Sequence, residues 1–216
     1  MSGPARVRFT EEMKGAVGFG AATFSEGYLQ GRASACPLMF HLTISIDDMD
    51  AFRKDPDHGA PAIGWVECQP LADRPMPVEL GVFNLFAPGF APGRTTMRYR
   101  LWFRDGAGNP MTMLGYKDVG DDPGLDVWKD TTSLATTLLN GHLTAGPRGP
   151  DGSPEPVDPT LVRARGIIFI RPLDFAKQLT TFRGTARGIA GLGGMFASSL
   201  WRVYRGRGSG SGSGES

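Results

Sequence analysis

Residues 96–119 read TMRYRLWFRDGAGNPMTMLGYKDV and contain the clearest β-hairpin signature in the sequence. Every second side chain from Met97 to Phe103 is apolar, and the side chains between them are mostly arginine, which is the period of a half-buried strand. Residues 105–110 supply a Gly- and Asn-rich turn that ends in proline. A second strand over 111–119 returns, so this stretch predicts an antiparallel β domain with an apolar interior.

Further alternating stretches predict strands before and after this hairpin. Together they give about seven to eight strands, joined mostly by short turns, and this favours an antiparallel meander that can close on itself. The predicted fold is mainly β (α+β): an antiparallel β-barrel or strongly curved sheet, lipocalin-like in general shape. The additional predicted strands cover residues 6–19, 38–46, 62–71, 78–86 and 161–170.

Helices are expected in a minority of the chain, two or three in all, weighted to its C-terminal half. Asp47 or Asp48 caps a single turn, and Asp130 or Thr131 caps a helix that runs to about Leu143. Residues 21–37 are expected to be turn-like. The two remaining helices are predicted over residues 172–182, after Pro172, and over 186–204.

The domain organisation follows from length and composition. A chain of 216 residues is long enough for one large domain with a sizeable core. Residues 1–205 are predicted to form a single β-barrel-like domain, with a flexible loop at 145–158. The Gly-Ser alternation of 206–216 is a linker or tag and is excluded from the fold.

Charge and cysteine content narrow the class of protein. A net charge of +1 argues against a nucleic-acid binder, although residues 161–207 are strongly basic. Cys36 and Cys68 are expected to be free thiols in a reducing compartment, with a disulfide as the alternative. Residues 1–20 lack the apolar core of a signal peptide. The sequence therefore predicts a cytoplasmic protein, peripheral to a membrane at most. Its richness in Arg, Ala, Gly and Pro indicates a bacterial source.

Catalytic and cofactor motifs are missing from the sequence. It contains no Gly-x-Ser-x-Gly nucleophile elbow, and its three histidines, at 41, 58 and 142, have no metal-ligand spacing. The Asp-rich stretch 118–126 lacks EF-hand spacing, and the glycines of 188–194 lack the Lys-Ser/Thr of a phosphate loop. We therefore expect no cofactor and no metal, and a non-catalytic role is favoured over an enzymatic one.

Two groups of side chains are candidates for binding. Methionine and aromatic residues concentrate in the strands and suit the wall of a lipid or sterol site, with an ordinary filled core as the alternative. The C-terminal helix combines an apolar stripe with arginine and aromatic side chains and would dock on a membrane or partner, or pack on its own sheet. The candidate ligand-binding residues are Phe40, Phe83, Met97, Tyr99, Leu101, Phe103, Met111, Met113 and Tyr116. The candidate docking residues are Arg187, Phe196, Trp201, Arg202 and Arg205.

Residues 9–15, 100–119 and 172–182 together carry a family resemblance. They are similar to an accessory domain found in bacterial proteins beside cholesterol-oxidase-like (glucose–methanol–choline type) flavin oxidoreductases and α/β-hydrolase lipases. The motifs of those enzymes themselves, the dinucleotide-binding Gly-x-Gly-x-x-Gly and the nucleophile elbow, are missing here. The resemblance implies a sterol or lipid context in which this domain assists an associated oxidoreductase or hydrolase.

Three functions remain open from the sequence. The first is a non-catalytic lipid- or sterol-binding accessory module. The second is a small enzyme acting on an apolar, lipid-like substrate, with His41, Tyr116, Lys117 and Asp118 as its polar cluster. The third is an interaction or scaffold domain that docks on a partner protein or membrane surface through its basic C-terminal helix.

Overall fold

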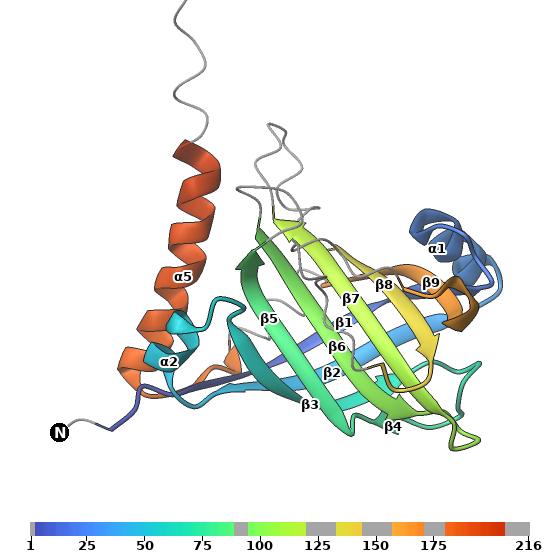
Figure 1. Ribbon diagram of the computed structural model, residues 1–216, viewed down its shortest axis with the longest axis horizontal. Coiled ribbons are helices and arrows are strands. Elements are labelled where there is room, and N and C mark those ends of the chain that lie inside the picture. Colours follow the sequence, from blue (N-terminus) through green and yellow to red (C-terminus); the bar gives the residue numbers. More distant parts are fainter. Residues whose placement is uncertain (1–2, 89–94, 120–132, 144–156, 171–179, 206–216) are drawn as a thin grey trace, which may run out of the picture.

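The structure is a computed structural model that describes residues 3–88, 95–119, 133–143, 157–170 and 180–205, with backbone alone for 118–119 and 196–205. Within this part of the chain the architecture is a closed barrel of antiparallel strands (Figure 1). The barrel strands are β1 (Val7–Phe19), β2 (Pro37–Ile46), β3 (Gly59–Glu67), β5 (Leu80–Pro88), β6 (Thr95–Arg104), β7 (Pro110–Val119), β8 (Ser133–Asn140) and β9 (Val162–Phe169). Two short strands, β4 (Met76–Pro77) and β10 (Arg183–Gly184), pair with β3 and β1.

Strand order in the barrel follows chain order. Each barrel strand pairs antiparallel with the next, and β9 returns to pair antiparallel with β1. An up-and-down barrel of this kind leaves no long open edge between its strands. The prediction of an antiparallel, lipocalin-like barrel is confirmed.

Closure of the barrel depends on glycine where β1 meets β9. A Cβ atom added at Gly15 would lie 2.0 Å from the Ile167 carbonyl oxygen, and one added at Gly166 would lie 2.0 Å from the Ala16 carbonyl oxygen. Side chains at these positions would force the two backbones apart. β1 changes partner along its length, because residues 14–19 pair with β9 while residues 7–8 pair with β10.

The barrel interior is built from alternate residues of every strand. In β2, Leu38, Phe40 and Leu42 are fully buried, while Met39 and His41 between them are partly exposed. In β6 this alternation holds from Tyr99 to Phe103, whereas the four residues from Thr96 to Tyr99 are all buried. The period-2 pattern that the sequence predicted is thus confirmed for the strand over 38–46 and for the second half of β6, but Arg98 is buried where the pattern predicted an exposed side chain.

The helices lie outside the barrel. The α1 helix (Phe24–Ala33) connects β1 to β2 and packs on β1 and β9, whereas α2 (Met49–Lys54) connects β2 to β3 near the start of α5 (Ala186–Arg205) (Figure 1). A single 3-10 turn, η1 (Pro159–Leu161), precedes β9. We name the two ends of the barrel after the nearest helix. The α2 end is where β1 begins and where β5 and β7 end. The α1 end is the opposite one and contains the β6–β7 turn.

The helix predicted over 130–143 is wrong, because residues 133–140 form β8. Leu134 and Leu138 are four residues apart, a spacing that fits one face of a helix and one face of a strand equally well. In the structure both leucines are fully buried in the core, with Thr136 between them. Every second side chain of this segment therefore faces inward, as in a strand. His142 consequently follows a strand and not a helix C-terminus.

The prediction that residues 21–37 are turn-like is also wrong, because they contain α1. Thr23 caps this helix by accepting from the Glu26 amide, and Glu26 accepts in return from the Ala22 amide. Gly27 and Gly31 weaken the helical signal, yet the structure needs them for close packing on β9 and β1.

Two further helix predictions are confirmed. Asp48 caps α2 as expected, and the helix predicted over 186–204 is α5. The strands predicted over 62–71 and 78–86 exist as β3 and β5, with their bounds moved to 59–67 and 80–88. The predicted helix over 172–182 falls mostly on residues 171–179, and the predicted loop at 145–158 mostly on 144–156; both of these ranges lie outside the described residues.

We predict that Gly27→Ala lowers the free energy of unfolding by about 1–3 kcal/mol, because the new methyl group would overlap backbone. Its Cβ would lie 1.9 Å from the Arg165 carbonyl oxygen, which outweighs the gain in helix propensity. Gly193→Ala in α5 is the matched control, since an added Cβ there meets nothing within 4 Å. Urea denaturation measures the free energy of unfolding of both variants. A Gly27→Ala protein that is as stable as the Gly193→Ala protein would contradict the argument that Gly27 is needed for packing.

Candidate functional site

A hydrogen bond between two buried polar side chains crosses the barrel interior. The Tyr99 hydroxyl of β6 donates to Glu11 Oε2 of β1 at 2.7 Å. The two strands lie opposite each other, four steps apart around the barrel in either direction. Glu11 and Tyr99 are only 4% and 3% exposed. A buried carboxylate needs such a partner, because burial without a hydrogen bond would cost free energy.

The charge environment of this bridge involves a third inward-facing group, Lys117 of β7. Burial raises the pKa of the Glu11 carboxyl, and the Tyr99 hydrogen bond and the positive charge of Lys117 oppose that shift. Burial also lowers the pKa of Lys117, against the influence of Glu11, and raises that of Tyr99 well above its ordinary value. Three perturbed titratable groups within an apolar interior are a recognised mark of a functional site. We call Glu11, Tyr99 and Lys117 the interior polar cluster.

A continuous series of aromatic rings leads to this cluster. Phe182 stacks on Phe9 with ring centroids 5.1 Å apart, and Phe9 meets Phe83 edge to face at 6.2 Å. The Phe83 ring is 4.9 Å from Tyr99, and Tyr99 is 5.3 Å from Phe40. We call these five residues the aromatic row. It begins at the half-buried Phe182 and ends against fully buried Phe40.

Interior side chains keep residual exposure at the α2 end of the barrel. Met97 is 8% and Ile170 9% exposed, whereas Phe103 and Met113, deeper in the barrel, are 0% exposed. Lys117, beside Met97 in the β6–β7 register, is partly exposed as well. At the α1 end the core residue Leu71 is 8% exposed as well, so slight exposure is common to both ends, and the aromatic row starts at the α2 end.

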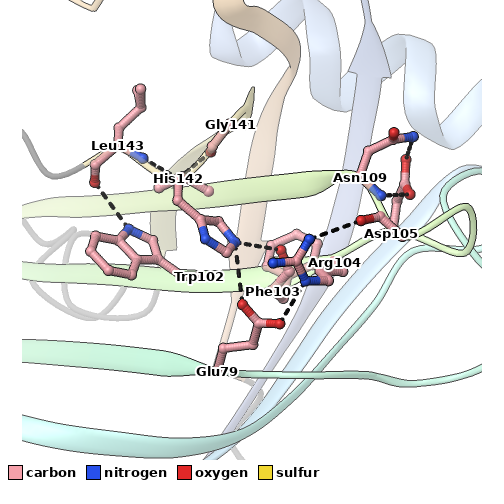
Figure 2. Close-up of polar contacts among 11 residues, drawn as sticks. Glu79, Trp102, Phe103, Arg104, Asp105, Asn109, Gly141, His142 and Leu143 are labelled. Atoms are coloured by element: carbon pink, nitrogen blue, oxygen red, sulfur yellow. Dashed lines mark hydrogen bonds and ion pairs between the residues drawn. The ribbon is translucent and has the colours of Figure 1, made fainter.

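Outward-facing side chains tie the strands together at the α1 end (Figure 2). Trp102 stacks on His142 with centroids 5.5 Å apart and donates to the Leu143 carbonyl oxygen at 3.0 Å. His142 Nε2 donates to the Phe103 carbonyl oxygen at 3.0 Å and lies 3.5 Å from Glu79. These contacts hold His142 and Leu143, which follow β8, against β6.

The β6–β7 turn completes this end. Asp105 accepts hydrogen bonds from the Asn109 side chain and from the backbone amides of Ala107 and Asn109, and these bonds hold its pKa below the ordinary value (Figure 2). The Gly106 amide donates to the Leu71 carbonyl oxygen at 2.9 Å, and Leu71 belongs to the core. This hydrogen bond joins the β6–β7 turn to the segment between β3 and β4 at the α1 end.

Most of the predicted ligand-binding residues are inside the barrel. Tyr116 instead faces outward, 38% exposed, with its ring 5.8 Å from Phe24 of α1. The interior residues of the predicted set are Phe40, Phe83, Met97, Tyr99, Leu101, Phe103, Met111 and Met113.

The four residues proposed for an enzymatic site do not come together. Lys117 faces the interior and Tyr116 the exterior, and the Asp118 side chain is outside the described residues. His41 lies on the outer face, stacked on Trp65 at 4.3 Å and 3.3 Å from Glu12. No convergent acid–base pair arises among the described members of this set.

The remaining candidates from the sequence have structural partners. His58 Nδ1 donates to the Leu85 carbonyl oxygen at 2.8 Å. Cys36 and Cys68 are both free, and burial raises the pKa of Cys68 to about 12. Within the described ranges, His, Cys, Asp and Glu side chains form no group of three that would hold a metal ion.

Only the first half of α5 is shown to dock on the barrel. Arg187 pairs with Asp50 of α2 at 2.7 Å, and Arg53 donates to the Gly191 carbonyl oxygen at 2.8 Å. Leu192, the residue after Gly191, is fully buried. The other predicted docking residues, Phe196, Trp201, Arg202 and Arg205, are helical, and their side chains lie outside the described part. None of the helices that the structure describes is long and apolar enough to cross a membrane.

Sequence reasoning missed Glu11, Phe9 and Phe182. A usable signal exists for Glu11, because it occupies the apolar face of its strand between Phe9 and Met13, where a charged residue needs a partner. No local signal identifies Phe182, whose role follows from contact with Phe9 far away in the sequence.

Comparison with known proteins adds no relative: no family model, no curated protein and no solved structure matches this chain.

We predict that Tyr99→Phe lowers the free energy of unfolding by about 1–3 kcal/mol near neutral pH, because it leaves the buried Glu11 carboxylate without its donor. The Tyr99 hydrogen bond lowers the Glu11 pKa, so its loss raises that pKa further. When the pKa of a carboxyl group is higher in the folded state than in the unfolded state, the free energy of unfolding falls as the pH rises above the ordinary pKa of that group. The deficit should therefore be larger at about pH 7 than at about pH 4.

Urea denaturation at the two pH values measures this difference. Tyr28→Phe, which makes the same change on the partly exposed Tyr28 of α1, is the control and should have little effect at either pH. An equal loss for Tyr99→Phe at both pH values would show that Glu11 does not titrate with the bridge.

Proposed function

We propose that this chain is a non-catalytic module that binds an apolar small molecule, a lipid or sterol, within its barrel. In this proposal it serves an associated lipid- or sterol-processing oxidoreductase or hydrolase. One observation carries it: an aromatic row runs from the partly exposed α2 end to a buried polar cluster. Sites for small apolar ligands combine such walls with few, placed polar groups.

The shape of the barrel supports this function. An eight-stranded barrel is just wide enough for its interior to be filled by side chains or to hold one small ligand. Methionines Met97, Met111 and Met113 line the interior here, and methionine adapts to irregular apolar shapes at low cost. Ligand entry at the α2 end is consistent with the fastening of the α1 end by Trp102 and His142.

The partner enzyme enters the proposal through the resemblance of residues 9–15, 100–119 and 172–182 to the accessory domains described above. A bacterial, cytoplasmic setting, peripheral to the membrane at most, is proposed on the same grounds as in the sequence analysis. The chain's role in this setting is to hold or present the apolar molecule.

We predict that the purified protein retains lipid-like molecules after incubation with a bacterial lipid extract, detected by mass spectrometry after gel filtration. Met97→Trp, which enlarges a side chain at the α2 end of the interior, should reduce retention by about tenfold. Leu80→Trp adds the same bulk at a position 50% exposed and serves as the control. Equal retention by both variants, with circular dichroism confirming that both are folded, would contradict binding in the interior.

A second candidate function rests on α5. Its described contacts are with α2, β1 and β10, and they involve the first half of a 20-residue helix. Figure 1 shows the remainder of the helix extending away from the barrel. Since residues 196–205 continue the apolar repeat and add four cationic or interfacial side chains, Trp201, Arg202, Tyr204 and Arg205, we propose that this half lies on an anionic membrane surface.

We predict that the double variant Arg202→Glu/Arg205→Glu weakens binding to anionic phosphatidylglycerol vesicles by about thirtyfold, measured by co-sedimentation, since each basic residue near such a surface contributes about 1 kcal/mol. The double variant Arg74→Glu/Arg163→Glu makes the same charge change at exposed positions on the barrel. A similar loss in both would mean that overall charge and not α5 governs binding. Unchanged sedimentation in both would rule out docking through α5.

A further inference from the structure

The two cysteines of the chain lie at the same end of the same pair of strands. Cys36 immediately precedes β2, and Cys68 immediately follows β3. Because β2 and β3 are antiparallel, with Met39 opposite Glu67, the start of β2 and the end of β3 meet at the α1 end of the barrel. Two residues that are 32 positions apart in the sequence are thereby brought to one edge of the fold.

The register of the strands also places both side chains on the inward face. The Val17 amide donates to the Cys36 carbonyl oxygen at 3.2 Å, which extends the β1–β2 pairing of Ala16 with Pro37 by one residue and sets Cys36 opposite fully buried Val17. Cys68 continues the inward face of β3 two residues after fully buried Val66.

Cys36 and Cys68 are diagonal neighbours across the β2–β3 pair. If the pairing of Met39 with Glu67 is continued by one residue, Leu38 lies opposite Cys68, and Cys36 lies two residues before Leu38. Diagonal neighbours of this kind are about 7–8 Å apart. A disulfide joins Cα atoms that are usually about 4.4–6.8 Å apart, so a short movement of the backbone is needed. The β2–β3 pairing ends at Met39 and Glu67 and therefore does not itself oppose that movement.

The electrostatics of Cys68 agree with this placement. Burial raises the pKa of the Cys68 thiol to about 12, and the charge of nearby Cys36 contributes to the same shift. Like charges disfavour ionisation in this way only when the two groups lie close together. The register and the charge interaction are therefore two separate indications that the sulfur atoms are neighbours.

The two thiols differ in their access to solvent. Cys36 is half-buried, whereas Cys68 is 1% exposed. A reagent from solvent therefore reaches Cys36 first. The raised pKa of Cys68 keeps it protonated near neutral pH, which protects it from direct attack and makes its own attack on Cys36 slow.

We propose that Cys36 and Cys68 are a redox modification site, at which a small disulfide such as oxidised glutathione generates a reversible intramolecular disulfide. The Cys36 thiolate attacks oxidised glutathione, breaks its S–S bond, forms a mixed disulfide and releases one glutathione. Cys68 then gives its proton to solvent and attacks the Cys36 sulfur, which forms the protein disulfide and releases the second glutathione. Two protein thiols are oxidised, and one glutathione disulfide is reduced to two thiols.

The test incubates the folded, full-length chain with oxidised glutathione, blocks the remaining thiols with iodoacetamide and maps the peptides by mass spectrometry. We expect a monomer that has lost two hydrogen atoms, in which the peptides containing Cys36 and Cys68 are joined, and which dithiothreitol returns to the dithiol. Because closure requires the Cys68 thiolate, conversion of the isolated mixed disulfide should accelerate about tenfold per pH unit between about pH 7 and pH 9.

Two matched variants assign the order of the steps. Cys68→Ala should accumulate the mixed disulfide on Cys36, because the attacking thiol is missing. Cys36→Ala should take up glutathione at least tenfold more slowly than Cys68→Ala, because its remaining thiol is buried. Circular dichroism checks that both variants are folded, and the peptide map of the wild-type protein does not depend on either of them.

Several results would overturn the proposal. They are retention of both thiols by the wild-type protein, glutathione on both cysteines without a cross-link, a disulfide that joins two chains, and a cross-link that forms only in urea. Equal glutathione uptake by the two variants, or closure at a rate independent of pH, would overturn it as well. None of these results bears on binding of an apolar molecule, so this inference and the proposed function fail separately.

Discussion

The pairing of β1 with β9 is the constraint on which the whole structure depends. It converts a meander of antiparallel strands into a closed barrel, and only closure gives the interior two opposite walls. Glycine at positions 15 and 166 permits this pairing, because a Cβ atom at either one would overlap the backbone of the other strand. Without this seam Glu11 and Tyr99 would lie on distant strands of an open sheet, and the hydrogen bond that spans the interior would have no geometry in which to form.

The barrel could be predicted from the sequence because strand alternation is a local property. The alternating residues of 97–103 and 38–46 directly encode which side chains face inward. Reasoning from local sequence failed at two kinds of position. In one, the spacing of apolar residues fits both a helix and a strand. In the other, contacts with neighbouring strands override a low helix propensity. Leu134 and Leu138 fit a helix as well as a strand, and only the neighbouring strands β7 and β9 select the strand. Gly27 lowers the helical tendency of a segment that is helical because its glycines allow close contact with β9.

The candidate site was predictable in its apolar part and not in its polar part. Phe40, Phe83 and Met97 follow from alternation alone, but their grouping around Tyr99 depends on the stagger of strands across the barrel. The contact between Tyr99 and Glu11 joins residues 88 positions apart, and no periodicity reports such a distance. What the sequence does hold is an anomaly: a carboxylate on the apolar face of a strand. A charged residue in such a place requires a compensating group, and the structure supplies Tyr99 and Lys117.

The change of partner along β1 also decides what holds Glu11 in place. Residues 14–19 of β1 lie in the β9 ladder and residues 7–8 in the short β10 ladder, and between them the Thr181 hydroxyl accepts from the Thr10 amide at 2.9 Å. Along its other edge β1 pairs with β2 without a break from Val7 to Ala16. The backbone of Glu11 is therefore fixed by the continuous β1–β2 ladder, which keeps its carboxyl group opposite Tyr99.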